Sequence, residues 1–178
     1  MLTPAQCTAL KALAMADQTA AALIAVGNDM ALADWFNTLT TSYIWRTSVP
    51  ADEVFDAITW ANLTPVDPPD GSAAYTNRAL LCQAKQINLQ ILLQGRERVS
   101  GAKATIRAGL SDALLNVPSG AGGAVQSAGW AAVKGVLSRF ATRAEAALAT
   151  GAGTQAAPST PAFDGQIGYM EIPPIRTA

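Results

Sequence analysis

Apolar residues recur every three or four positions along most of the chain, which predicts helices joined by short turns. The first helix begins at residues 3–6 (TPAQ), where a threonine cap, a proline and a glutamine form a capping box. Its pattern continues to Val26, and Gly27 ends it. Asn28 then caps a short helix over residues 29–36.

The middle of the chain alternates helical patterns with turn-forming segments. Residues 40–49 are aromatic and β-branched, which favours either an extended segment or a connector packed on the core. Proline, glycine and aspartate make residues 62–72 the clearest loop, and residues 118–123 a turn. Further helices are predicted from Pro50 and over 73–94, 102–117 and 125–149. The apolar stripe of the helix over 73–94 contains Leu80, Ala84, Ile87 and Ile91.

The composition changes after Gly151. Residues 150–161 form a low-complexity linker, and residues 163–172 alternate with a period of two, which predicts a single β-strand. An unpaired strand tends to add to another sheet, so this segment is predicted to dock on a neighbouring chain. The alternative is pairing with residues 43–49 of its own chain. The predicted docking residues are Phe163, Ile167, Tyr169 and Ile172.

These patterns predict a mainly α fold, a bundle of about five or six helices with an extended C-terminal arm containing one β-strand. The expected division is a helical domain over 1–149 and a flexible linker plus docking arm over 150–178. The longest apolar run, residues 20–26, is too short to cross a bilayer, and the N-terminus has no signal-peptide pattern.

Charge is segregated along a chain whose net charge is −1. Residues 1–77 carry two basic and eight acidic side chains, and residues 78–143 carry nine basic and two acidic ones. The segregation fits solvated helix faces, an acidic patch meeting a basic patch on the next subunit, or a basic surface along DNA. The candidate basic face comprises Arg78, Lys85, Arg96, Arg98, Lys103 and Arg107.

Catalytic and cofactor motifs are missing from the sequence. It has no histidine, and its two cysteines, Cys7 and Cys82, lack metal-site spacing. The glycines of residues 120–123 lack the Gly-Lys-Ser/Thr of a phosphate loop, and Asp52, Glu53 and Asp56 sit where they compensate a helix dipole. We therefore expect no enzyme activity, no catalytic residue, no metal and no cofactor. With only 14% charged residues, the composition favours a subunit covered by neighbours.

Three stretches of the sequence are distinctive together: IWRTSV (44–49), ATIRAGL (104–110), and ATRAEAALATG (141–151) leading into GQIGY (165–169). They resemble small proteins encoded among the virion-assembly genes of tailed bacteriophages. The resemblance implies a head–tail connector, or adaptor, located in the virion neck and assembled in the host cytoplasm. Its implied partners are its own copies in a ring of about twelve, the portal protein, the next neck or tail protein, and genomic DNA passing through without sequence specificity.

Two alternatives stay open at this stage. One is another neck component, such as a stopper or tail-completion protein. The other is a small helical DNA-binding or packaging factor that uses the basic residues from Arg78 to Arg107. A DNA-binding factor would bind DNA with a steep salt dependence, whereas a connector would copurify with virions.

Overall fold

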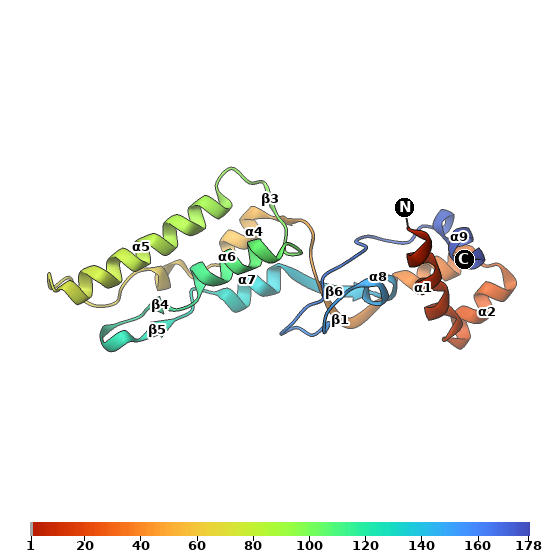
Figure 1. Cartoon of the computed structure of the whole chain (residues 1–178), viewed down its shortest axis with the longest axis horizontal. Helices are drawn as coiled ribbons and strands as arrows, with labels where there is room; N and C mark the ends of the chain where they lie inside the picture. The colour runs from red at the N-terminus through yellow and green to blue at the C-terminus, as the bar shows by residue number, and fades with distance from the viewer. Residues whose placement is uncertain (1) are drawn as a thin grey trace. The chain divides into compact units, whose positions relative to one another are not determined.

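A computed structural model describes residues 2–178 (Figure 1). Helices, short 3₁₀ turns included, make up 55% of the chain, and the strands are few and short, so the fold is mainly α as predicted. Contacts divide the chain into two compact units. Unit 1 comprises residues 1–45 and 138–178, and unit 2 comprises residues 46–137.

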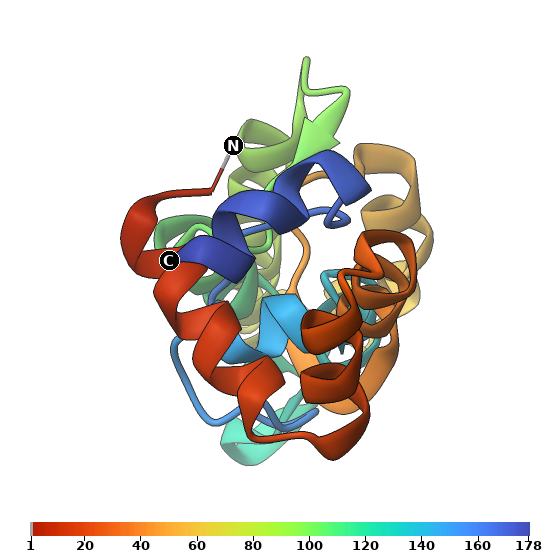
Figure 2. The same cartoon turned by 90° about the vertical axis from the view of Figure 1, so that its right-hand side faces the viewer.

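Unit 1 is a helical cluster beside a two-stranded antiparallel sheet. Its elements are α1 (Pro4–Met15), α2 (Gln18–Val26), α3 (Asp29–Asn37), β1 (Leu39–Trp45), β6 (Ser138–Thr142), α8 (Arg143–Leu148), η3 (Tyr169–Glu171) and α9 (Ile172–Thr177). Figure 2 shows α9 beside α1, and the side chain of Lys11 donates to the carbonyl oxygen of Ala178 at 2.8 Å. The helices α1 and α9, from opposite ends of the sequence, therefore belong to one packed cluster.

The start of unit 1 confirms the predicted caps and corrects one helix. Thr3 and Gln6 form the capping box, and Gly27 ends α2 in the left-handed region with φ 67°. The single helix predicted up to Val26 is two helices bent by 113°. The break follows from Asp17, whose carboxylate accepts from the amide of Ala20 and so caps a new helix.

The helix predicted over residues 125–149 is wrong. The segment contains β5 (Val125–Gln126), α7 (Trp130–Val136), β6 and α8. Residues 138–142 pair antiparallel with β1, and the rings of Tyr43 and Phe140 meet across the strands at 4.6 Å. Of the predicted alternatives for residues 40–49, the extended segment is therefore the one that forms.

The predicted division at residue 150 and the predicted terminal strand also need correction. Residues 163–172 form no strand; they lead through η3 into α9, whose first turn holds two prolines. Proline suits that position because its φ angle is already helical. Ile167, Ile172 and Ile175 lie in the same buried cluster as Leu10 and Phe36. The C-terminal segment is thus part of the core of unit 1.

Unit 2 is built on one long helix. Its elements are β2 (Val49–Pro50), α4 (Ala51–Asp56), η1 (Trp60–Leu63), α5 (Ala73–Leu93), β3 (Arg98–Val99), α6 (Ala104–Leu114), β4 (Val117–Pro118), η2 (Ala121–Gly123), β5 and α7. The α5 helix, which Ser72 caps, agrees closely with its predicted range. It packs against α6, β4 and η1, and Figure 1 shows α6 and the β4–β5 hairpin on the same side of it.

Candidate interaction surface

Acidic and thiol side chains form no reactive cluster in residues 2–178. His, Cys, Asp and Glu residues there make no group of three or more that could hold a metal ion. Cys82 is buried, and burial raises the pKa of its thiol, which keeps the thiol protonated and weakly nucleophilic. Glu53 of the acidic α4 turn pairs with Arg46 at 2.9 Å.

The glycines of residues 120–123 form the end of the β4–β5 hairpin. No single helix in the described residues is both long and apolar enough to cross a membrane. The bent α1–α2 pair reaches that length and composition only when its two helices are counted together.

Three of the four predicted docking residues pack against the core of their own chain. Ile167 and Ile172 are 1% and 0% exposed, and Phe163 is partly buried against the same cluster. Only Tyr169, at 60%, projects into solvent. The prediction that this set forms one surface for another chain is therefore wrong for Ile167 and Ile172, because the apolar groups that suit docking also suit the core.

Asn37 holds the C-terminal segment through its side chain. Its amide nitrogen donates to the carbonyl oxygen of Ile167 at 2.9 Å, and its amide oxygen accepts from the backbone nitrogen of Ile167 at 2.8 Å. The side chain thus satisfies both backbone groups of Ile167, as a strand partner would. Nothing in the local sequence pointed to this role.

Glu145 holds the same segment further upstream. Its side chain is 1% exposed and accepts two hydrogen bonds from Arg139, at 2.6 and 2.8 Å, and one from the backbone of Gly165 at 3.0 Å. Burial by itself would raise the pKa of Glu145, but the hydrogen bonds from Arg139, Thr142 and Gly165 lower it overall. The Thr-x-x-Glu spacing of Thr142 and Glu145 was a readable capping-box signal.

The six residues of the predicted basic face all belong to unit 2, and several are committed to contacts within it. Lys85 is buried and donates to the carbonyl oxygens of Asp112 and Leu115, at the C-terminal end of α6. Arg107 donates to the carbonyl oxygens of Gly101 and Ala102. Arg78 pairs with Asp67, and Arg98 contacts Ser48. The exposed residues of the set are Arg96, Arg98 and Lys103.

Helix α5 exposes the apolar stripe that the sequence showed. Its buried positions are Cys82, Lys85, Leu89 and Leu93. Its exposed apolar stripe, defined as Leu80, Ala84, Ile87 and Ile91, lies on the opposite side, because a helix turns 100° per residue. Leu80, Ile87 and Ile91 are 57%, 54% and 66% exposed. Both sides of the helix are apolar, and the rest of unit 2 covers one of them.

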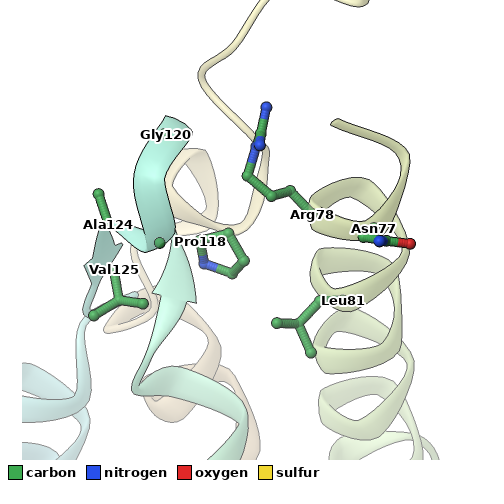
Figure 3. Close-up of a pocket in the computed structure, with 8 residues that line it drawn as sticks. Asn77, Arg78, Leu81, Pro118, Gly120, Ala124 and Val125 are labelled. Carbon is green, nitrogen blue, oxygen red and sulfur yellow. The ribbon is translucent and has the colours of Figure 1, made fainter. Parts of the chain in front are cut away.

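Two further apolar features border α5. On one side Leu81 faces a pocket of about 270 Å³ whose other wall is the β4–β5 hairpin, with Pro118 and Val125 (Figure 3). On the other side the half-exposed rings of Phe55 and Trp60 stack at 5.1 Å beside Gln86 and Gln90. An apolar surface this broad is typical of a protein–protein contact.

Comparison with protein-family models, curated proteins and solved structures finds no match to this chain.

Proposed function

We propose that this chain is a non-catalytic structural subunit of a tailed-bacteriophage neck, a head–tail connector that assembles as a ring of about twelve between the portal protein and the tail. The observation that carries the proposal is the apolar surface of unit 2 around α5. A monomeric protein rarely exposes such an apolar surface to water, whereas in an assembly the neighbouring subunits cover it.

The resemblance to virion-assembly proteins gives the proposal its place in the particle. The stretches that carry this resemblance include residues of both units. Residues 104–110 form the start of α6, and residues 165–169 contain Ile167, whose backbone makes two hydrogen bonds with the side chain of Asn37. In this proposal the mainly helical framework carries the assembly contacts. The C-terminal segment contributes through Tyr169 and Met170, which are 60% and 73% exposed.

A DNA-binding or packaging factor has weaker support. The side chains of Lys85 and Arg107 donate hydrogen bonds to backbone carbonyl oxygens, and Arg78 forms an ion pair with Asp67. A nucleic-acid surface needs unpaired cations that can neutralise phosphates. Genomic DNA would therefore pass this subunit without specific binding.

A nonsense mutation in the coding gene of a phage that carries this chain tests the proposal. We expect filled heads and separate tails that do not join, and joining restored by the chain supplied from a plasmid. Electron microscopy of the lysate shows the particles, and mass spectrometry of purified wild-type virions shows whether the chain is present. Complete infectious virions that form without the chain would overturn the proposal.

A further inference from the structure

The exposed apolar stripe of α5 has the spacing of a coiled-coil seam. Leu80, Ala84, Ile87 and Ile91 are separated by four, three and four residues, which is the a/d repeat that packs one helix on another. The stripe extends about 16 Å along the helix axis. Unit 2 leaves all four positions exposed.

The charges of α5 indicate what kind of helix fits this seam. Its charged residues are Arg78 and Lys85; the first pairs with Asp67 and the second is buried against α6. The residues bordering the stripe are neutral and exposed, namely Gln83, Asn88 and Gln90. Flanking charges normally select a different partner helix and repel a wrong one. A neutral border selects no charged partner and does not repel an identical helix.

The sizes of the side chains indicate the direction of the second helix. In an antiparallel pair centred between Ala84 and Ile87, the small Ala84 of each copy faces the large Ile87 of the other. Leu80 then faces Ile91. A parallel pair would place the two alanines opposite each other and leave a gap, which well-packed interfaces avoid.

We propose that the exposed stripe of α5 binds the same stripe of a second copy of this chain, antiparallel and about a two-fold axis. The proposed function has this surface covered by another protein, and the contact names that protein as a second copy of the chain. The contact therefore rests on the proposed function. A two-fold contact joins two copies and leaves no equivalent surface free for a third. We therefore propose it for the purified chain, and the contacts between neighbours in a ring would be different ones. The short seam is small beside the roughly 800 Å² per partner of a stable interface, so we expect a micromolar dissociation constant.

Sedimentation equilibrium of the purified chain tests the contact. We expect the wild type to dimerise at micromolar concentration and Ile87→Glu to weaken dimerisation by at least about 100-fold, because two carboxylates would be buried without partners. Val26→Glu is the matched control. Val26 is 75% exposed on α2 of unit 1, so this variant should dimerise like the wild type. Circular dichroism checks that both variants are folded.

Cysteine cross-linking tests the direction. With Leu80→Cys and Ile91→Cys made in separate chains, an antiparallel pair brings residue 80 of one copy next to residue 91 of the other. Copper–phenanthroline oxidation should cross-link the mixture, while Leu80→Cys alone should not cross-link. In that antiparallel pair, position 80 of one copy would lie about 16 Å from position 80 of the other, beyond disulfide reach.

A monomer at 100 µM or above, or a dimer that Ile87→Glu leaves intact, would overturn the contact. Efficient cross-linking of Leu80→Cys with itself would overturn the antiparallel direction. The proposed function fails separately, if virions form without the chain.

Discussion

Trp45 and Ser138 lie opposite each other as the last register pair of the β1–β6 ladder, although all of unit 2 separates them in the sequence. Beyond this pair the backbone nitrogen of Arg46 donates to the carbonyl oxygen of Leu137 at 2.8 Å. Unit 2 is therefore inserted between two strands that are hydrogen-bond partners. Each unit also has its own set of buried apolar side chains.

This pairing predicts that unit 1 folds without unit 2. Replacing residues 46–137 by Asn-Gly should give a two-residue hairpin, because paired strand ends suit a type I′ turn. We expect a folded chain with cooperative thermal unfolding, measured by circular dichroism and by dispersion of the amide NMR signals. A chain with the same composition and residues 163–178 shuffled is the control. Collapsed, non-cooperative spectra for the unshuffled chain would show that unit 1 depends on unit 2.

The C-terminal segment should be required for the stability of unit 1. Cutting after Thr150 removes Ile167, Ile172 and Ile175, all at most 1% exposed. Each buried isoleucine contributes about 2–5 kcal/mol, against a typical total stability of about 5–15 kcal/mol. We expect the truncated chain to lose the unfolding transition of unit 1 in calorimetry.

Point variants in full-length protein separate core packing from docking in that segment. Ile172→Ala should lower the free energy of unfolding by about 2–5 kcal/mol. Tyr169→Ala, at a 60% exposed position, should change it by at most about 0.5 kcal/mol. A truncated chain as stable as the full-length one would restore the docking-arm interpretation of residues 163–172.

Local signals in the sequence predicted local structure well. The Thr3–Gln6 capping box, the Gly27 stop and the bounds of α5 are confirmed, because caps and left-handed glycines act within one helical turn. β6 was missed because Val133, Leu137 and Ala144 keep helical spacing across it. Only pairing with β1, almost a hundred residues earlier, makes residues 138–142 extended.

The exposed stripe shows a different limit of sequence patterns. Leu89 and Leu93 are buried and Ile87 and Ile91 are exposed, although all four are large and apolar. Periodicity shows that both sides of α5 are apolar, and it cannot tell which side the chain itself covers. The buried side even contains Lys85, which a pattern would assign to solvent. Its role depends on the α6 carbonyls, which only the fold brings near.

Lys85 should therefore stabilise unit 2 rather than bind DNA. Lys85→Met keeps the length of the side chain but leaves the carbonyl oxygens of Asp112 and Leu115 without this donor. We expect a loss of about 1–3 kcal/mol in chemical denaturation, since two partly buried acceptors near a helix C-terminus lose a charged donor. Arg96→Met, at an exposed position of the same predicted face, should leave stability within about 0.5 kcal/mol. Equal small effects for both variants would contradict the structural role.

Glu145 should make the stability of unit 1 fall in acid. Burial alone would raise its pKa, yet the hydrogen bonds from Arg139, Thr142 and Gly165 lower it below the ordinary value of 4.5. Because the folded-state pKa is below the unfolded one, the contribution is fully present above the unfolded pKa. It is lost as pH falls through the folded pKa.

Glu145→Gln isolates that contribution. The amide can still accept from the Thr142 backbone, but it lacks the charge that binds Arg139, and we expect a loss of about 2 kcal/mol at pH 7. Denaturant midpoints measured from pH 7 to pH 3 should fall more steeply for the wild type than for the variant, so that the two curves converge in acid. Glu171→Gln, on a partly exposed side chain that accepts a local hydrogen bond from Gly168, is the control and should follow the wild type. Parallel wild-type and Glu145→Gln curves over that pH range would mean that Arg139 and Glu145 are held together by packing, with no net contribution from their charge.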